Sequence, residues 1–207
     1  MPRPRLSLWW VMTLIGVSAA VSLSAAELEI TLKNGTPPEA STAEQLRGLL
    51  QRFDVTPWLF TSRVEIEARA VPHSHPVLTL NTRHLGQDDL LLSTFIHEEL
   101  HWWLVAHQQQ ADAAVADLRA RFPAIAVGGV DGADSEHSSY EHLIVIYLEW
   151  QGDKALLGDR RAREVMDFWA QDHYRQLYAL VIASEDAVRD VVGAHGLACC
   201  AQPAQNR

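Results

Sequence analysis

The chain has 207 residues, of which 48% are hydrophobic, and this suits one globular domain with a sizeable core. Its formal net charge is −9, which argues against nucleic acid or an anionic membrane surface as a partner. The two cysteines, Cys199 and Cys200, are neighbours; they cannot staple the fold, although a vicinal or intermolecular disulfide is open to them.

The N-terminus has the pattern of an export signal. Two arginines among the first five residues precede an apolar stretch over residues 6–23, and Ser24-Ala25-Ala26 offers the small residues that signal peptidase reads. We predict a signal peptide over residues 1–26, export to the periplasm or the medium, and no stable membrane association after cleavage. The competing interpretation is an uncut anchor with a membrane-attached accessory domain, because the apolar stretch approaches the length of a spanning helix.

The first part of the mature chain predicts a small sheet. Apolar side chains at every second position indicate strands over residues 27–33, 63–70 and 77–82. Between the first two, Pro37-Pro38 reads as a breaker, and Ser41 with Glu44 forms a capping box for a helix that reaches Phe53.

From residue 88 onwards the apolar pattern becomes helical. Asp88 can cap a long helix, a second follows over residues 112–122, and Ser138 with Glu141 forms a capping box for an apolar helix through Trp150. Two more helices are expected, around residues 160–182 and 185–194. The predicted fold class is therefore α+β, with a small N-terminal sheet and a mostly helical body, in a single domain over residues 27–207.

One helical motif carries chemistry: His97-Glu98-Glu99-Leu100-His101. Residues four apart lie about one turn apart on the same helix face, so the two imidazoles can converge on one ion, and neutral imidazole suits Zn²⁺. Glu98 lies about 100° around the helix from His97, where it can reach a metal-bound water without being a ligand. Glu99 lies about another 100° on and is expected to be structural or solvated.

This motif resembles the active-site helix of the zincin metallopeptidases. The strand over residues 77–82 stands just before it, as does the zincin edge strand that borders the cleft and can pair with extended substrate. The resemblance covers residues 63–150. It implies a zinc-dependent hydrolase acting on peptide or protein substrates, with His97 and His101 as zinc ligands and Glu98 as the general base.

A catalytic zinc site usually takes three protein ligands, and we predict His142 as the third. It lies at the start of the apolar helix from Ser138, matching the gluzincin arrangement in which a second helix supplies the last ligand. Gluzincins use a glutamate there; Glu141 is that residue type, but it is also the expected capping partner of Ser138. Glu149, seven residues after His142 and on almost the same face, can accept a hydrogen bond from a ligand histidine.

Two other histidines compete for the third position. His107 falls where the metzincins have their last histidine, but Leu104 stands in place of the glycine that lets the metzincin chain turn. The only downstream methionine, Met166, lies in a helical segment, whereas a metzincin needs a methionine turn. His137 is the remaining candidate.

The sequence also leaves the oxyanion-stabilising group and the activity itself open. The alternative to an enzyme is an exported protein that binds zinc or serves a structural role without turnover; an intact Glu98 favours catalysis, since a binder needs no base. Candidates for stabilising the oxyanion are the tyrosines and histidines around the motif, namely His137, Tyr140, His173, Tyr174 and Tyr178.

Overall fold

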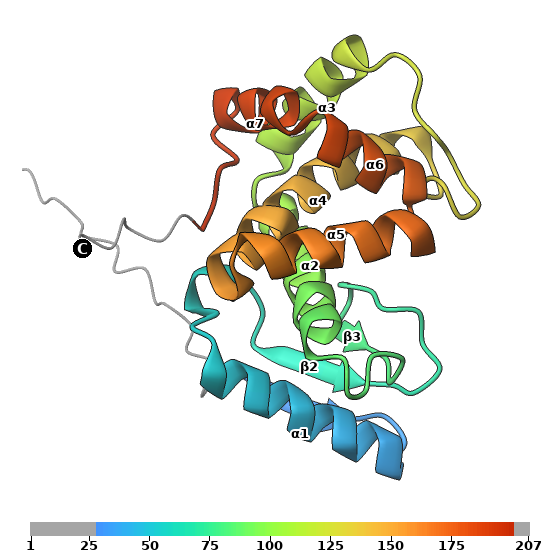
Figure 1. Cartoon of the computed structure of the whole chain (residues 1–207), viewed down its shortest axis with the longest axis vertical. Coiled ribbons are helices and arrows are strands. Elements are labelled where there is room, and N and C mark those ends of the chain that lie inside the picture. The colour runs from blue at the N-terminus through green and yellow to red at the C-terminus, as the bar shows by residue number, and fades with distance from the viewer. Residues whose placement is uncertain (1–27, 201–207) are drawn as a thin grey trace, which may run out of the picture.

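The computed structural model describes residues 28–200, so the predicted signal peptide over residues 1–26 lies outside the described residues. Between residues 28 and 200 the chain forms a small sheet followed by a helical body, which confirms the predicted α+β class (Figure 1). The elements are β1 (Glu29–Leu32), α1 (Pro37–Arg52), the 3-10 turn η2 (Thr56–Trp58), β2 (Arg63–Ile66), β3 (Leu78–Leu80), α2 (Asp88–Ala106), α3 (Gln108–Arg121), α4 (Glu136–Leu157), α5 (Asp159–Asp172), α6 (Arg175–Ala183) and α7 (Glu185–Ala194).

None of the helices within residues 28–200 combines the length and the apolar character that crossing a membrane requires.

The sheet is parallel throughout, in the order β1-β2-β3. Two parallel strands need a crossover connection that returns the chain to the end of the sheet where the first strand began. Helix α1 provides this connection between β1 and β2. The return from β2 to β3 has no helix. It consists of residues 67–77, and within it the backbone of His73 pairs antiparallel with Thr79 of β3. This loop therefore covers the outer edge of the sheet.

The first helix begins earlier than predicted. Pro37 and Pro38 do not break the chain but occupy the first two helical positions, where a missing N–H costs nothing and the fixed φ favours the helix. Thr36 is the capping residue in place of Ser41, and Glu39 takes the part that the sequence assigned to Glu44, because its carboxylate accepts the Thr36 backbone N–H at 3.1 Å.

Glu39 also fastens α1 to the sheet. Its buried carboxylate accepts hydrogen bonds from the backbone and side chain of Asn34 and from the backbone N–H of Ala68, just after β2. Burial alone raises the pKa of Glu39, but these hydrogen bonds together with that from Thr36 outweigh it and lower the pKa from 4.5 to about 2. The turn before α1 and the end of β2 are thereby hydrogen-bonded to the same carboxylate.

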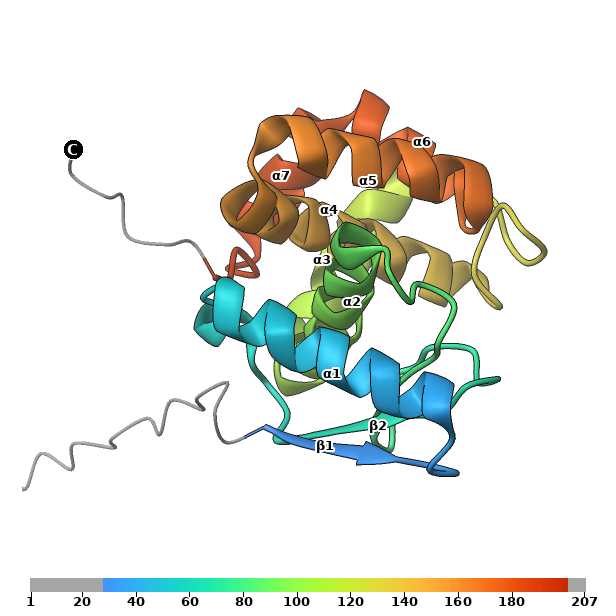
Figure 2. The same ribbon diagram turned by 60° about the horizontal axis from the view of Figure 1, so that its bottom comes forward.

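Helix α2 runs through the middle of the molecule (Figures 1 and 2). The sheet and α1 lie at one end, and α4 to α7 lie at the other. Because α2 is enclosed by both layers, nearly every residue of its central turns is buried, Phe95, Ile96 and Leu100 among them. Gly152 lets α4 approach closely, since a Cβ at this position would lie 3.0 Å from Trp58 Nε1 and 3.2 Å from Ile96 Cγ2.

Two helical boundaries differ from the prediction and shape the site. The N-cap of α4 is Ser135, whose hydroxyl accepts the Ser138 N–H at 3.1 Å, so Ser138 already lies inside the helix. The helix expected over residues 160–182 is two helices, α5 and α6, which are separated at His173 and Tyr174. Tyr174 adopts a left-handed conformation with φ 50°, and this reverses the chain without a glycine or a proline.

Candidate metal centre

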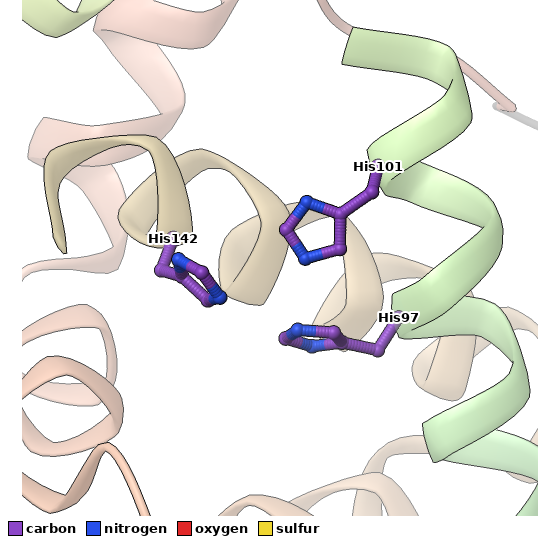
Figure 3. Close-up of side chains that lie close together, drawn as sticks. All are labelled: His97, His101 and His142. Atoms are coloured by element: carbon purple, nitrogen blue, oxygen red, sulfur yellow. The ribbon is translucent and has the colours of Figure 1, made fainter. Parts of the chain in front are cut away.

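Three histidines converge between α2 and α4. Figure 3 shows the imidazoles of His97 and His101 on α2 pointing toward that of His142 on α4. One ring nitrogen from each lies within 4.8 Å of the other two. Nitrogens bound to one tetrahedral Zn²⁺ at ~2.0–2.1 Å stand about 3.3 Å apart, so small side-chain rotations close the cluster on an ion. The group can hold a metal ion.

The orientation of His97 is fixed by Glu149. The Nδ1–H of His97 donates to Glu149 Oε2 at 2.8 Å, and both side chains are buried. Burial lowers the pKa of His97, but the Glu149 carboxylate outweighs it and the net shift is upward. Because Nδ1 is engaged, Nε2 is left for an ion. The sequence-predicted hydrogen bond from a candidate ligand histidine to Glu149 is thus present, and the histidine is His97.

His142 is oriented by its own helix. Its Nδ1 donates to the backbone carbonyl of Ser138 at 2.7 Å, again leaving Nε2 toward the cluster. Burial, with a smaller effect of His97, lowers the pKa of His142 to about 3, and the pKa of His101 is lowered well below 6.5 for the same reasons. Neutral imidazoles with a free lone pair are what a metal ion requires, so the donor set fits Zn²⁺.

A buried polar network stands behind His97. Glu149 also accepts hydrogen bonds from the hydroxyls of Ser93 and Tyr178, the latter at 2.9 Å, and Trp169 Nε1 donates to the Ser93 hydroxyl at 3.0 Å. The carboxylate of Glu149 therefore has three donors, which offset the cost of burying its charge. This network holds one candidate ligand and joins α2, α4, α5 and α6.

The competing third ligands lie elsewhere. His107 ends α2, and its Nδ1 contacts the Trp103 carbonyl at 2.9 Å while its ring packs on the Trp103 indole. His137 is exposed and lies 3.8 Å from Asp112. The pKa of Glu141 is raised by burial, while His137 opposes this shift and Asp112 adds to it. Neither these histidines nor Glu141 belong to the His97-His101-His142 group.

The two adjacent glutamates of the motif have separate environments. Glu98 lines the cavity beside the histidines; burial raises its pKa to about 7, while His97 and His73 oppose the shift. Glu99 is fully buried on the opposite side, where Oε2 accepts the backbone N–H groups of Phe60 and Thr61 at 2.7 and 3.0 Å. Glu99 is thus structural, as expected, but it is not solvated.

The histidines form the floor of a cavity of about 570 Å³. One wall is the loop between β2 and β3, over residues 70–74, and the opposite wall contains Gly129, Gly132 and Asp134 from the loop before α4. Both loops lie on the same side of the molecule in Figures 1 and 2. A volume of this size admits a few residues of a peptide or another small molecule.

The edge of β3 is not free at its centre. The N–H and the carbonyl of Thr79 are both bonded to the backbone of His73, at 2.7 and 3.1 Å. The expectation that this strand pairs with extended substrate is therefore wrong at Thr79. The wall of the cavity is formed instead by the segment that covers β3, and Trp102 Nε1 ties that segment to α2 through the Ser74 carbonyl at 2.9 Å.

His173 and Tyr174 enter the cavity because the helix breaks at this point. The Tyr174 ring lies 4.5 Å from the His142 ring, centroid to centroid. The Nδ1 of His173 contacts Asp172 at 2.9 Å, and Asp172 is paired with Arg83. Both residues were named from the sequence as candidates for stabilising the oxyanion. The helix break that brings them into the cavity was not predicted, since the segment carries no breaker residue.

Comparison with known proteins returns no match to a family model, to a curated protein or to a solved structure. The motif, the histidine group and the cavity that they line are therefore the features that bear on function.

Proposed function

We propose that the chain is an exported, zinc-dependent hydrolase acting on peptide bonds. The observation that carries this proposal is the convergence of His97, His101 and His142 at the floor of an accessible cavity, with the Glu98 carboxylate beside them. Three histidine ligands leave a coordination position open, which is the arrangement of catalytic zinc sites. Export is proposed from the pattern of residues 1–26 alone.

Each residue of the site has a separate role in the proposed reaction. When bound, Zn²⁺ acts as a Lewis acid that acidifies water and polarises a carbonyl group. His97, His101 and His142 hold the ion, and Glu149 keeps His97 in the tautomer that binds it. Glu98 takes a proton from the attacking water and delivers it to the leaving amine.

Tyr174 is the best-placed group for stabilising the oxyanion. Of the five candidates, Tyr140 donates to the Phe122 carbonyl and Tyr178 donates to Glu149. His137 is exposed beside Asp112, and the Nδ1 of His173 is engaged with Asp172. Tyr174 lines the cavity, and no hydrogen bond of its hydroxyl is found within residues 28–200. Burial raises its pKa, with further contributions from Glu98 and Asp134, so the phenol keeps its proton at neutral pH and can donate it.

Tyr174→Phe is expected to lower kcat on the order of 10²-fold while leaving KM and the zinc content nearly unchanged, because it removes one donor to the transition state. Steady-state kinetics with a peptide substrate measures the effect. Tyr140→Phe is the matched control, since its hydroxyl bonds to a backbone carbonyl outside the cavity. Equal kcat values for Tyr174→Phe and the unmutated protein would remove Tyr174 from the mechanism.

The activity itself is tested with a mixture of peptides of randomised sequence, incubated with the zinc-loaded protein and analysed by mass spectrometry. Cleavage products are expected with zinc, none after chelation, and their return when zinc is restored. A zinc-loaded protein that cleaves no peptide, under conditions where it stays folded, would refute the peptidase proposal and favour the alternative of a zinc-binding protein without turnover.

A further inference from the structure

Acidic side chains outnumber basic side chains around the cavity, histidines aside. The acidic residues that line it are Glu98, Asp134 and Glu149, and the lining contains one basic side chain other than histidine, Arg83. Glu149 accepts three hydrogen bonds, and Glu98 lies beside the three histidines as the proposed base. Asp134 is the acidic side chain of the lining that is left to face a substrate.

Arg83 does not supply a free cation. Its guanidinium forms a two-pronged ion pair with Asp172, with Nη1 at 2.7 Å from Oδ2 and Nη2 on Oδ1. A planar guanidinium matched to a carboxylate in this way has its charge satisfied. The hydrogen bonds from Arg83 lower the pKa of Asp172 to about 2, so Asp172 stays ionised at any pH at which the protein would work. Arg83 therefore offers no free positive charge to a substrate carboxylate.

Asp134 is held at the cavity wall by its neighbours. The N–H of Ala133 donates to the Ser139 hydroxyl at 3.0 Å, and Ser135 caps α4, the helix that carries His142. The backbone of Gly132 lies so close to that of Ala126 that a Cβ on Gly132 would lie 2.2 Å from the Ala126 carbonyl oxygen. The carboxylate of Asp134 is exposed, and no hydrogen bond or ion pair of it is found within residues 28–200.

We propose that Asp134 selects substrates that carry a positive charge next to the scissile bond. This inference rests on the proposed function and names its substrate class. The positive charge is either the α-amino group of a peptide or a lysine or arginine side chain, because both satisfy the same carboxylate.

The test measures binding, not turnover. Three hydroxamates, whose chelating group takes the open metal position, are titrated into the zinc-loaded protein by calorimetry at pH 6.5, where amines are protonated. Norleucine hydroxamate carries a free α-amino group, Nα-acetyl-lysine hydroxamate carries a side-chain amine, and Nα-acetyl-norleucine hydroxamate is uncharged. The same titrations are made with Asp134→Asn and with Asp131→Asn, a control on the same loop whose carboxylate does not line the cavity.

One amine-bearing hydroxamate is expected to bind about three- to fivefold more tightly than the uncharged one, as for an exposed ion pair. The preference should vanish in Asp134→Asn and in 0.5 M salt, and persist in Asp131→Asn. The amine that gains affinity identifies the source of the charge. Equal binding of all three compounds, or a preference that survives Asp134→Asn, overturns the inference but leaves the proposed function standing; failure of every hydroxamate to bind the zinc-loaded protein overturns both.

Discussion

Glu98→Gln is expected to lower kcat by about 10²–10⁴-fold and to leave the zinc content unchanged. The amide cannot accept a proton from water, although it fills the same space beside the histidines. Because Glu98 lines the cavity and is not one of the three converging side chains, its loss removes the base without removing a ligand. Steady-state kinetics together with elemental analysis of the same sample measures both quantities.

Glu99→Gln is the matched control for this substitution, since it makes the same chemical change one residue along. Glu99 contacts Phe60 and Thr61 on the side of α2 away from the cavity, and burial raises its pKa to about 8. Its replacement should leave kcat within a few-fold of the unmutated protein. A Glu98→Gln protein that retains full activity would show that the motif does not use this residue as a base.

Glu149→Ala is expected to destabilise the domain by at least about 3 kcal/mol. The substitution leaves three buried donors without an acceptor, from His97, Ser93 and Tyr178, and each such group costs about 1–3 kcal/mol. The measurement is urea unfolding of the metal-free protein, followed by its circular dichroism. An unfolding free energy close to that of the unmutated protein would mean that the network contributes nothing to stability.

Glu149→Gln distinguishes the effect of Glu149 on zinc affinity from its effect on the stability of the fold. The amide oxygen still accepts one or two of the hydrogen bonds, so the domain is expected to fold, while the weaker acceptor orients His97 less firmly. Zinc affinity should fall about 10- to 100-fold, as when the outer partner of a ligand histidine is changed. Competition with a chromogenic chelator measures this fall, and an unchanged affinity would contradict the role given to Glu149.

Residues on one helix were predictable because a helix fixes its own geometry. The four-residue spacing of His97 and His101 places them on one face whatever surrounds them, and the seven-residue spacing of His142 and Glu149 does the same on α4. The packing of α4 against α2 could not be derived in this way, since spacing alone does not say which helices pack together. The close approach of α4 to α2 at Gly152 supplies that information.

The parts that were not predictable depend on tertiary contacts. The break at Tyr174 has no local signal, and the turn is held by contacts such as the one between the Arg175 N–H and the Val130 carbonyl at 3.1 Å. The covering of Thr79 by His73 likewise depends on a loop that crosses the sheet edge. Helix starts were displaced because more than one residue near Thr36 and Ser135 can cap. The vicinal cysteines are joined in the structure, and no role in the site follows from this.

The zinc content of the purified protein over residues 27–207, determined by elemental analysis beside His142→Ala and His107→Ala, tests the central claim most directly. His142 belongs to the converging group, whereas His107 packs on Trp103 and is the matched histidine outside it. We predict about one zinc per chain, retained in His107→Ala and lost in His142→Ala. A carefully handled unmutated protein that binds no zinc, or equal zinc in all three proteins, would contradict the two-helix metal centre.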